Sequence, residues 1–196
     1  MKKFFSIDSH SPNSYIEIRN HIYDNLKDIV LSNREIIILC IGTDRCTGDS
    51  LGPFVGEKLK KIMPKGNFFI YGTLENPVHA QNLENVINKI YSSFENPYII
   101  AIDSSLGSVN DIGKIIIKNE KLSPGLALNK NLPQVGDLSI TGIVNIAGNF
   151  EFLVLQNTRL YVVMCLVDCI YKGLYHFILK AQKEKQEFYS FSNKTI

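Results

Sequence analysis

Apolar residues in the first third of the chain recur at two different periods, one helical and one typical of a buried strand. Between residues 12 and 32 they recur every three or four positions among charged residues, which predicts an amphipathic helix. Residues 35–42 form an unbroken, largely β-branched run that ends in glycine, which indicates a strand covered on both faces. Residues 48–63 return to helical spacing, so this region is predicted to fold as strand, polar loop and helix.

The same alternation then repeats. Residues 67–73 are predicted to form a strand, residues 78–94 a helix and residues 98–104 another buried strand. Strands that alternate with helices imply right-handed crossovers and a mostly parallel sheet between helical layers. The pattern therefore predicts an α/β fold.

The pattern changes after Gly107. Residues 113–118 and 138–144 are predicted strands, and the polar loop between them contains prolines and glycines. An unstructured loop of this length is unusual in a compact domain. We expect the part from Lys121 to Asp137 to shape a substrate groove, and a flexible surface excursion is the alternative.

The C-terminal part of the chain is strongly helical in pattern. Residues 152–185 predict one long helix, or two helices with a break at Gly173. Since neither a linker nor an internal repeat is visible, we expect one domain over residues 1–196 with its core in residues 35–185.

Composition narrows the class of protein. With 196 residues and 45% hydrophobic positions, the chain can bury a sizeable core. Its 21 basic and 19 acidic residues give a formal charge of +2, which is too balanced for a dedicated nucleic-acid binder. The most apolar late stretch, Leu160 to Ile170, is interrupted by Asp168 and has about half of the roughly 20 residues of a membrane span, so no membrane partner is expected.

Two features of the sequence bear on the compartment. The first residues are followed at once by polar positions, so they do not develop the apolar region of a signal peptide. The four cysteines form no CxxC pair, and three of them lie in apolar runs, where thiols act as small hydrophobic groups. We expect reduced thiols and a cytoplasmic protein.

Two loops follow predicted strands and are rich in polar residues. They span residues 42–53 and 103–107, and they carry Asp49 and Asp103. Ligands of parallel sheets collect at the carboxyl ends of the strands, so neighbouring strands would bring these two acids into one crevice. Paired carboxyl groups there can share a proton and act as base and acid on an amide. Each aspartate could instead cap a helix or a turn.

Other chemical interpretations of these segments are weaker. The glycines around residue 48 suggest a phosphate loop, but their spacing is too long and Asp49 stands where lysine is required. The sequence GDSLG around Ser50 matches a nucleophile elbow, although Ser50 does not directly follow a strand. A thiol hydrolase built on Cys46 and His79, and an ion pair between Arg159 and one of the aspartates, are further alternatives.

Four segments of the chain form a recognisable set: IGTDRCTGDSLGP (41–53), GTLENPVHA (72–80), AIDSSLG (101–107) and VGDLSITG (135–142). In these segments, and over roughly residues 35–170, the sequence resembles the YyaC-type sporulation proteins, relatives of the germination protease of spore-forming bacteria. That protease and the hydrogenase maturation proteases share a fold, so the resemblance implies a three-layer αβα sandwich with a mostly parallel sheet.

The resemblance also assigns roles to the two acids. In the germination protease, one catalytic aspartate lies in a D-x-L-G-P segment and another in an A-I-D segment, positions that correspond to Asp49 and Asp103. In the hydrogenase maturation proteases the equivalent acids bind nickel together with a histidine. This chain has no histidine between Ser104 and Tyr175. The resemblance thus implies a catalytic pair that needs no metal or other cofactor.

The two acids at the strand ends and the resemblance together lead us to expect an aspartate-dependent peptidase-like protein that acts on a small protein or peptide, and the resemblance implies a role in sporulation. A non-catalytic protein of the same fold that binds a peptide or partner is the alternative, and a Ser50 hydrolase is a weaker one. The sequence does not predict the oligomeric state. The residues expected to contact a substrate are Thr43, Asp44, Ser104, Gly136, Asp137 and Gly142.

Overall fold

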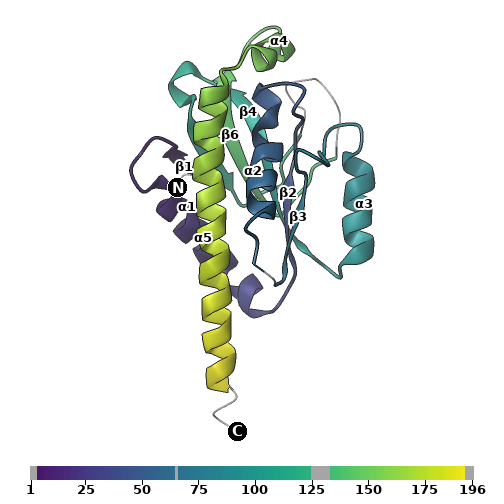
Figure 1. The fold of residues 1–196 in the computed structure, drawn as a ribbon, viewed down its shortest axis with the longest axis vertical. Helices are drawn as coiled ribbons and strands as arrows, with labels where there is room; N and C mark the ends of the chain where they lie inside the picture. The colour runs from purple at the N-terminus through teal and green to yellow at the C-terminus, as the bar shows by residue number, and fades with distance from the viewer. Residues whose placement is uncertain (1–3, 65, 125–132, 193–196) are drawn as a thin grey trace.

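The computed structural model describes residues 4–64, 66–124 and 133–192. These residues form a mixed α/β fold around a central six-stranded sheet flanked by helices (Figure 1). The strand order is β1-β5-β6-β4-β2-β3. The strands are β1 (Phe5–Asp8), β2 (Ile36–Cys40), β3 (Phe68–Tyr71), β4 (Tyr98–Gly107), β5 (Lys114–Lys118) and β6 (Leu138–Ile146).

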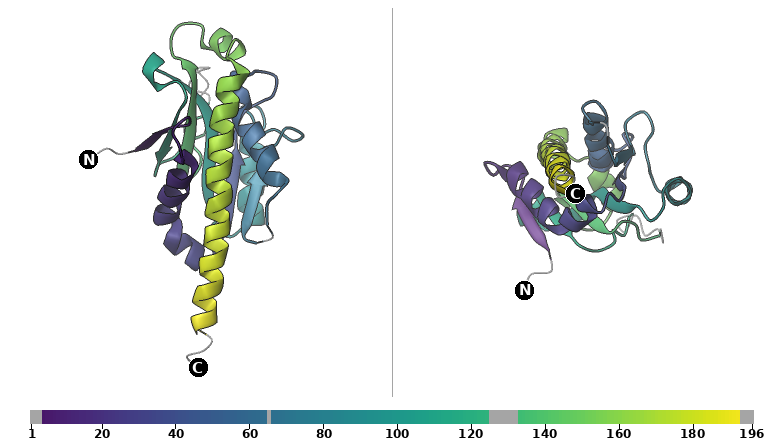
Figure 2. Two further views of the ribbon diagram at one scale, coloured as in Figure 1. Left: turned by 60° about the vertical axis from the view of Figure 1, so that its left-hand side comes forward. Right: turned by 90° about the horizontal axis from the view of Figure 1, so that it is seen from below.

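Helices cover the two faces of the sheet unequally. Figure 2 shows α1, α2 and α5 together on one face, with α3 on the other. The helices are α1 (Ser14–Leu31), α2 (Leu51–Lys60), α3 (Leu83–Ser93), α4 (Glu151–Gln156) and α5 (Leu160–Ser192), and two short 3-10 turns are η1 (Gly48–Ser50) and η2 (Val109–Asp111).

The strand arrangement confirms that the strand after the first helix lies beside the one that carries Asp103. β2 pairs in parallel with both β3 and β4, and β4 pairs in parallel with β6. β5 and β1 complete the sheet in antiparallel orientation. The sequence pattern missed β1, because four residues are too short to establish an alternating period.

The core has one apolar cluster on each side of the sheet. All five residues of β2 are buried, as expected for a central strand covered on both faces. Ile36 and Ile38 belong to the cluster with α1, α2 and α5, whereas Ile37 and Leu39 belong to the cluster with α3. The larger cluster anchors the long C-terminal helix.

The helical pattern near the C-terminus breaks earlier than the sequence suggests. α4 ends at Gln156 and α5 begins at Leu160, so the break lies at residues 157–159 and the helix continues through Gly173. A Cβ atom at Gly173 would lie 2.5 Å from Cγ2 of Ile18 on α1. Gly173 thus allows two helices to pack closely, which explains a glycine inside a helix.

α5 is unusually long and apolar, which raises the question of whether it could span a membrane. Residues Leu160–Ser190 would pass as a membrane-spanning helix by length and composition alone. Its buried residues, among them Leu166, Leu174 and Phe177, lie in the same apolar cluster as α1 and α2. In this structure α5 is therefore a core helix.

The less covered face of the sheet leaves room for a site. α3 packs over β2 and its neighbours, in a cluster that also includes Leu122 and Val135. Beside it, Lys118 of β5 and Ser139 and Thr141 of β6 line a pocket instead of packing against a helix.

Gly42 positions the loop that follows β2. Its φ is 140°, a conformation that residues with a side chain rarely adopt, and its N–H donates to the Val78 carbonyl at 2.8 Å. A Cβ atom there would lie 2.0 Å from the carbonyl oxygen of Asp49. That oxygen accepts the N–H of Thr43 at 3.0 Å. The turn that carries Asp49 can therefore fold back onto the strand end because residue 42 has no side chain.

Replacing Gly42 tests this arrangement. Gly42→Ala is expected to lower the free energy of unfolding by about 1–3 kcal/mol, because the new methyl group collides with backbone and the φ is unfavourable. Gly148→Ala is the matched control, since no atom lies within 4 Å of a Cβ built there. Urea unfolding followed by circular dichroism measures both. Equal stability of the two variants would contradict the proposed role of Gly42.

Candidate active site

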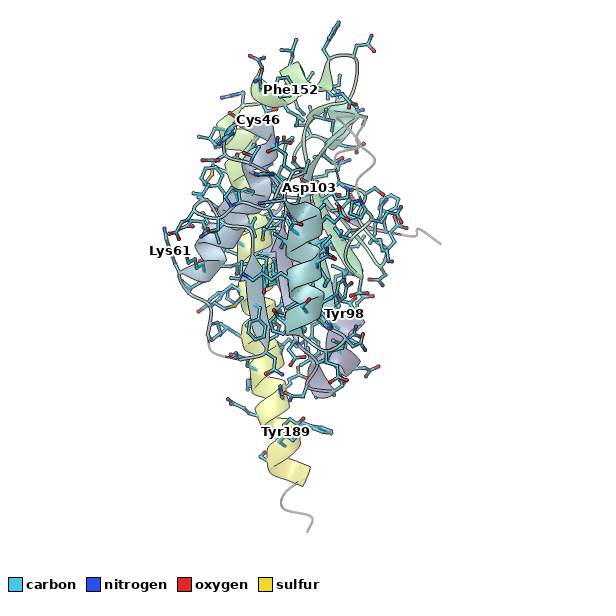
Figure 3. All side chains as sticks on the ribbon, turned by 90° about the vertical axis from the view of Figure 1, so that its right-hand side faces the viewer. Cys46, Lys61, Tyr98, Asp103, Phe152 and Tyr189 are labelled. Atoms are coloured by element: carbon cyan, nitrogen blue, oxygen red, sulfur yellow. The ribbon has the colours of Figure 1, made fainter. Side chains whose placement is uncertain are left out.

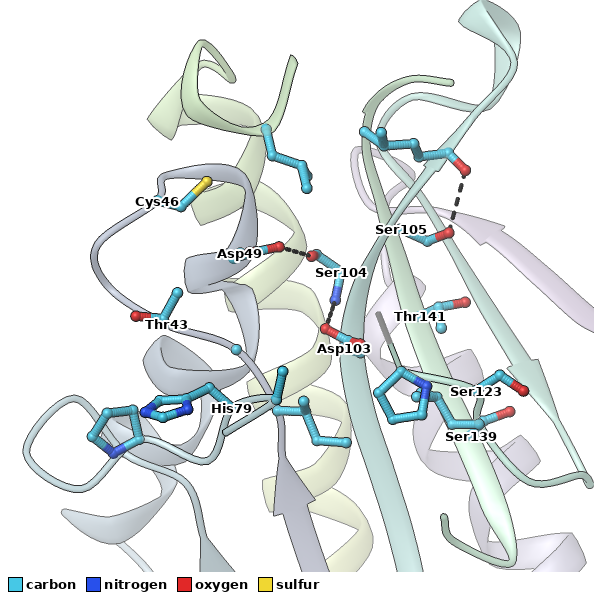
Figure 4. Close-up of a pocket in the computed structure, with 18 of the residues that line it drawn as sticks. Thr43, Cys46, Asp49, His79, Asp103, Ser104, Ser105, Ser123, Ser139 and Thr141 are labelled. Atoms are coloured by element: carbon cyan, nitrogen blue, oxygen red, sulfur yellow. Dashed lines mark hydrogen bonds between the residues drawn. The ribbon is translucent and has the colours of Figure 1, made fainter. Parts of the chain in front are cut away.

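A pocket of about 700 Å³ opens at the carboxyl ends of the parallel strands. Its walls come from the loop after β2, the end of β4, the segment after β5 and the short helix α4. This is the edge at which open parallel sheets bind ligands. Asp49 and Asp103 both line it (Figure 4).

Asp49 reaches the pocket from η1, the turn before α2. Its N–H donates to the Cys46 carbonyl at 3.0 Å, which holds the turn closed. Asp49 lies in the first turn of η1, whose N-cap residue is Thr47. The Oδ1 atom of Asp49 lies 3.4 Å from the hydroxyl of Ser104, which donates to it. The carboxyl group of Asp49 is therefore directed toward β4.

Asp103 follows the buried run Ile99–Ile102 inside β4. The strand continues to Gly107, so Asp103 is part of a strand and does not cap a turn. It lies opposite Thr141 of β6 and is half-buried. Its Oδ1 accepts the N–H of Ser104 at 2.8 Å.

Ser104 thereby connects the two acids. Its backbone N–H donates to Asp103 and its hydroxyl donates to Asp49 (Figure 4). Ser104 therefore contacts both carboxyl groups, which lie 54 residues apart in the chain.

Both acids hold a proton more tightly than a free carboxyl group does. Burial raises the pKa of Asp49 above its ordinary value of 3.8, and the Ser104 hydroxyl opposes this rise. Burial, followed by the negative charge of Asp49, raises the pKa of Asp103 well above the ordinary value, and the Ser104 N–H opposes it. Because neighbouring like charges are costly and Asp103 is the more strongly shifted of the two, Asp103 takes up a proton before Asp49 as the pH falls.

Some of the predicted substrate-contacting residues line the pocket. Thr43, Asp44 and Ser104 do so, with Thr43 and Asp44 on the loop after β2. Of the loop from Lys121 to Asp137, residues 121–124 also line the pocket, and residues 125–132 lie outside the described part of the chain.

Gly136 and Asp137 do not line the pocket, contrary to the expectation from sequence. The N–H of Asp137 donates to the Ile99 carbonyl at 2.7 Å, and its Oδ2 accepts the Ile99 N–H at 2.8 Å. Asp137 therefore joins the start of β6 to the start of β4. Ile99 precedes Asp103 by four residues, which is about 13 Å along a strand. Figure 3 shows Tyr98 well removed from Asp103 in this direction.

Gly142 is also absent from the pocket. It faces the helical layer, where a Cβ atom would lie 2.4 Å from Cδ1 of Leu51. Its neighbour Thr141 lines the pocket, because successive residues of a strand point to opposite faces. Gly142 therefore allows α2 to approach the sheet and does not contact the crevice.

Sequence reasoning missed two parts of the pocket. The first is a row of hydroxyl groups on the open face of the sheet, from Ser105, Ser139 and Thr141. The alternation of polar and apolar residues in β6 was the signal that could have revealed it. The second is α4, which contributes Phe152 and Leu155 and which the sequence placed within a longer helix.

The alternative roles predicted for Ser50, Cys46 and Arg159 do not fit the geometry. Ser50 is only 2% exposed, and its hydroxyl donates to the Thr47 carbonyl at 2.6 Å. Cys46 lines the pocket, but burial raises the pKa of its thiol, and no hydrogen bond joins it to His79 in the described structure. Arg159 is exposed and forms no ion pair with the aspartates among the described residues.

Nickel favours imidazole ligands, and one histidine, His79, lines the pocket. Its Nδ1 accepts the N–H of Gln81 at 3.3 Å. Within residues 4–64, 66–124 and 133–192, no group of three or more His, Cys, Asp or Glu residues is placed to hold a metal.

Comparisons with known proteins agree with this architecture. A family model described as "Protein of unknown function (DUF1256)" matches residues 6–173. "Uncharacterized protein YyaC" of Bacillus subtilis (strain 168) is 50% identical over 143 residues, which are 73% of this chain and 69% of that protein. The crystal structure of the NiFe hydrogenase maturation protease HycI from Thermococcus kodakarensis KOD1 matches with a TM-score of 0.53 and 19% identity. The match covers 80% of this chain and 99% of that one.

The raised pKa of Asp103 predicts how stability depends on pH. A carboxyl group with a higher pKa in the folded chain favours folding at low pH, and this contribution is lost as pH rises through the folded pKa. Asp103→Asn removes the charge, so at neutral pH it is expected to raise Tm by about 2–4 °C, the effect of roughly 1 kcal/mol in a chain of this size. Below pH 3.8 the difference should vanish.

Thermal unfolding across this pH range measures the effect. Asp28→Asn, which alters an exposed carboxyl group on α1, is the matched control and should leave Tm unchanged at each pH. If Asp103→Asn lowers Tm at neutral pH, the carboxyl group is not destabilised by its surroundings.

Proposed function

Since the chain belongs to the DUF1256 family and has a fold similar to that of a hydrogenase maturation protease, we propose that it is a peptidase that cleaves a small protein or peptide. Asp49 and Asp103 are the catalytic residues of this proposal. The observation that carries it is the pair of acids joined by Ser104 in one pocket.

In the proposed reaction one acid donates a proton and the other removes one. Asp103 holds the proton, because burial and the charge of Asp49 both favour its neutral form. Asp49, as the ionised partner, removes a proton from a water molecule while the water oxygen bonds to the amide carbon. Asp103 then protonates the amide nitrogen as the carbon–nitrogen bond breaks. Exchange of the proton between the acids and solvent restores the starting state.

The pocket suits an extended polypeptide. The hydroxyl groups of Ser105, Ser139 and Thr141 line the open face of the sheet, where they can hydrogen-bond to main-chain N–H and C=O groups. Thr43 and Asp44, on the loop after β2, line the same pocket and are proposed to contact the substrate near the bond that is cleaved.

The cellular setting is part of the proposal. The four sequence segments that resemble YyaC-type sporulation proteins support a role in the sporulating cell or spore. The described structure contains Cys40, Cys46, Cys165 and Cys169 as free thiols, which supports a reducing cytoplasm. The chemistry above uses the two acids and water, and needs no metal or other cofactor.

A cleavage assay tests the assignment. The chain is incubated with a degenerate synthetic peptide pool, and new termini are identified by mass spectrometry. Asp49→Asn and Asp103→Asn are each expected to slow cleavage by about 100-fold or more, since each removes a proton-transfer group. Asp28→Asn is the matched control on α1 and should cleave at the normal rate.

The outcomes separate the candidate functions. Undiminished cleavage by either pocket variant would refute the proposed mechanism. If the chain binds peptides tightly but cleaves none across mildly acidic to neutral pH, the protein is a peptide-binding module of the same fold.

The rate of cleavage should depend on pH in a bell shape. Asp49 must be ionised, so activity falls at low pH as it gains a proton; Asp103 must be neutral, so activity falls at high pH as it loses one. Because both pKa values are raised, both limbs should lie above pH 3.8. Initial rates measured in buffers of constant ionic strength give the profile. A rate that only increases with pH would show that no neutral carboxyl group is required.

A further inference from the structure

α4 presents an apolar surface to solvent beside the pocket. Phe150, Phe152 and Leu153 are 78%, 52% and 52% exposed, and they are called the α4 platform below. Phe152 also lines the pocket, so the platform is continuous with it. Figure 3 shows Phe152 at the end of the molecule near Cys46, with Asp103 further into the fold.

The exposure of these side chains is unfavourable in a free protein. Large apolar groups gathered at a pocket rim mark binding surfaces more often than scattered ones do. Phe150 in addition has a φ of 59°, a conformation that is costly for a bulky side chain. A ligand that covers the platform would recover free energy from the removal of these groups from water.

The platform is held firmly in place. The side-chain amide of Asn145 on β6 donates to the Val154 carbonyl at 3.3 Å and to the Thr158 hydroxyl at 3.2 Å. The Thr158 hydroxyl donates to the Val154 carbonyl at 2.9 Å, and Thr158 is buried. These bonds fix α4 to the sheet. The platform therefore needs little ordering when a ligand binds.

The inner face of α4 contacts the turn that carries Asp49. Leu155 is buried, and a Cβ atom at Gly48 would lie 2.7 Å from its Cδ2 and 2.8 Å from its carbonyl oxygen. α4 is thus packed on the catalytic turn while Phe152 and Leu153 face outward. Phe152 therefore connects the pocket that contains the acids with the exposed platform.

From this continuity we propose that the α4 platform binds large apolar side chains of the substrate polypeptide, close to the amide that lies at Asp49 and Asp103. The proposal rests on the proposed function and adds a substrate class: extended segments with Phe, Leu, Ile or Val near the cleaved bond. Such segments are buried in folded proteins, so the substrate is an unfolded chain or an accessible terminus.

Other occupants of the platform fit less well. Side chains of this size bury about 150–250 Å² each, so the platform exposes only some 300–400 Å², less than half of what one partner contributes to a stable dimer interface. A membrane surface attracts clusters of Lys and Arg, whereas α4 contains Glu151 and no basic residue.

Peptide binding by a variant with impaired cleavage tests the proposal. Two fluorescein-labelled peptide pools are added to the Asp103→Asn variant. The apolar pool carries Phe, Leu, Ile and Val at the positions where the polar pool carries Ser, Thr, Asn and Gln. The triple variant Phe150→Ser, Phe152→Ser, Leu153→Ser is expected to bind the apolar pool about tenfold or more weakly, with its affinity for the polar pool unchanged. Tyr91→Ser, on α3 and 59% exposed, is the matched control.

The results distinguish this proposal from the proposed function. Selective binding of the apolar pool that depends on the platform, without cleavage by the unaltered chain, would support the platform and refute the peptidase. Cleavage by the unaltered chain, with no loss of binding to the apolar pool in the triple variant, would support the peptidase and refute the platform. The platform proposal is also overturned if the unaltered chain forms a dimer in sedimentation velocity and the triple variant does not. The same holds if the unaltered chain floats with phosphatidylglycerol vesicles and the triple variant does not.

Discussion

Two carboxyl groups in one partly buried crevice repel each other and lose hydration, and the surrounding fold has to offset both costs. The strand pairing and the turn after β2 determine where the two acids lie. β2 and β4 pair in register, so their ends meet at one edge of the sheet, and Gly42 lets the following turn bend back toward β4. Ser104 supplies a hydrogen bond to each acid. The raised pKa values of both acids lower the remaining cost, because a neutral carboxyl group neither repels its neighbour nor loses the hydration of a charge.

The sequence predicts the central fold well because its strongest signals are local. The runs that become β2 and β4 are short, β-branched and apolar at nearly every position, a pattern typical of strands covered on both faces. Asp103 directly follows such a run and Asp49 lies in the loop after one, so both could be recognised as candidates. Position along a strand was enough to predict their convergence once the strands were taken as neighbours.

The remaining parts depend on contacts between distant segments. Gly136 and Asp137 stand near the predicted groove in sequence, but the hydrogen bonds of Asp137 to Ile99 place this segment at the far end of the sheet. Gly142 and Gly173 permit close packing with Leu51 and Ile18, and nothing local distinguishes such glycines from breaks or turns. α4 was merged with the helix after it because both share one apolar period, and only the fold shows which of its residues reach water.

The two hydrogen bonds from Ser104 differ in how strongly they depend on the amino acid at position 104. The bond to Asp103 comes from the main chain, so almost any amino acid at position 104 would preserve it. The bond to Asp49 needs a hydroxyl group, and only serine or threonine offers one in a side chain this short. Drift at this codon would therefore loosen Asp49 first and leave Asp103 anchored.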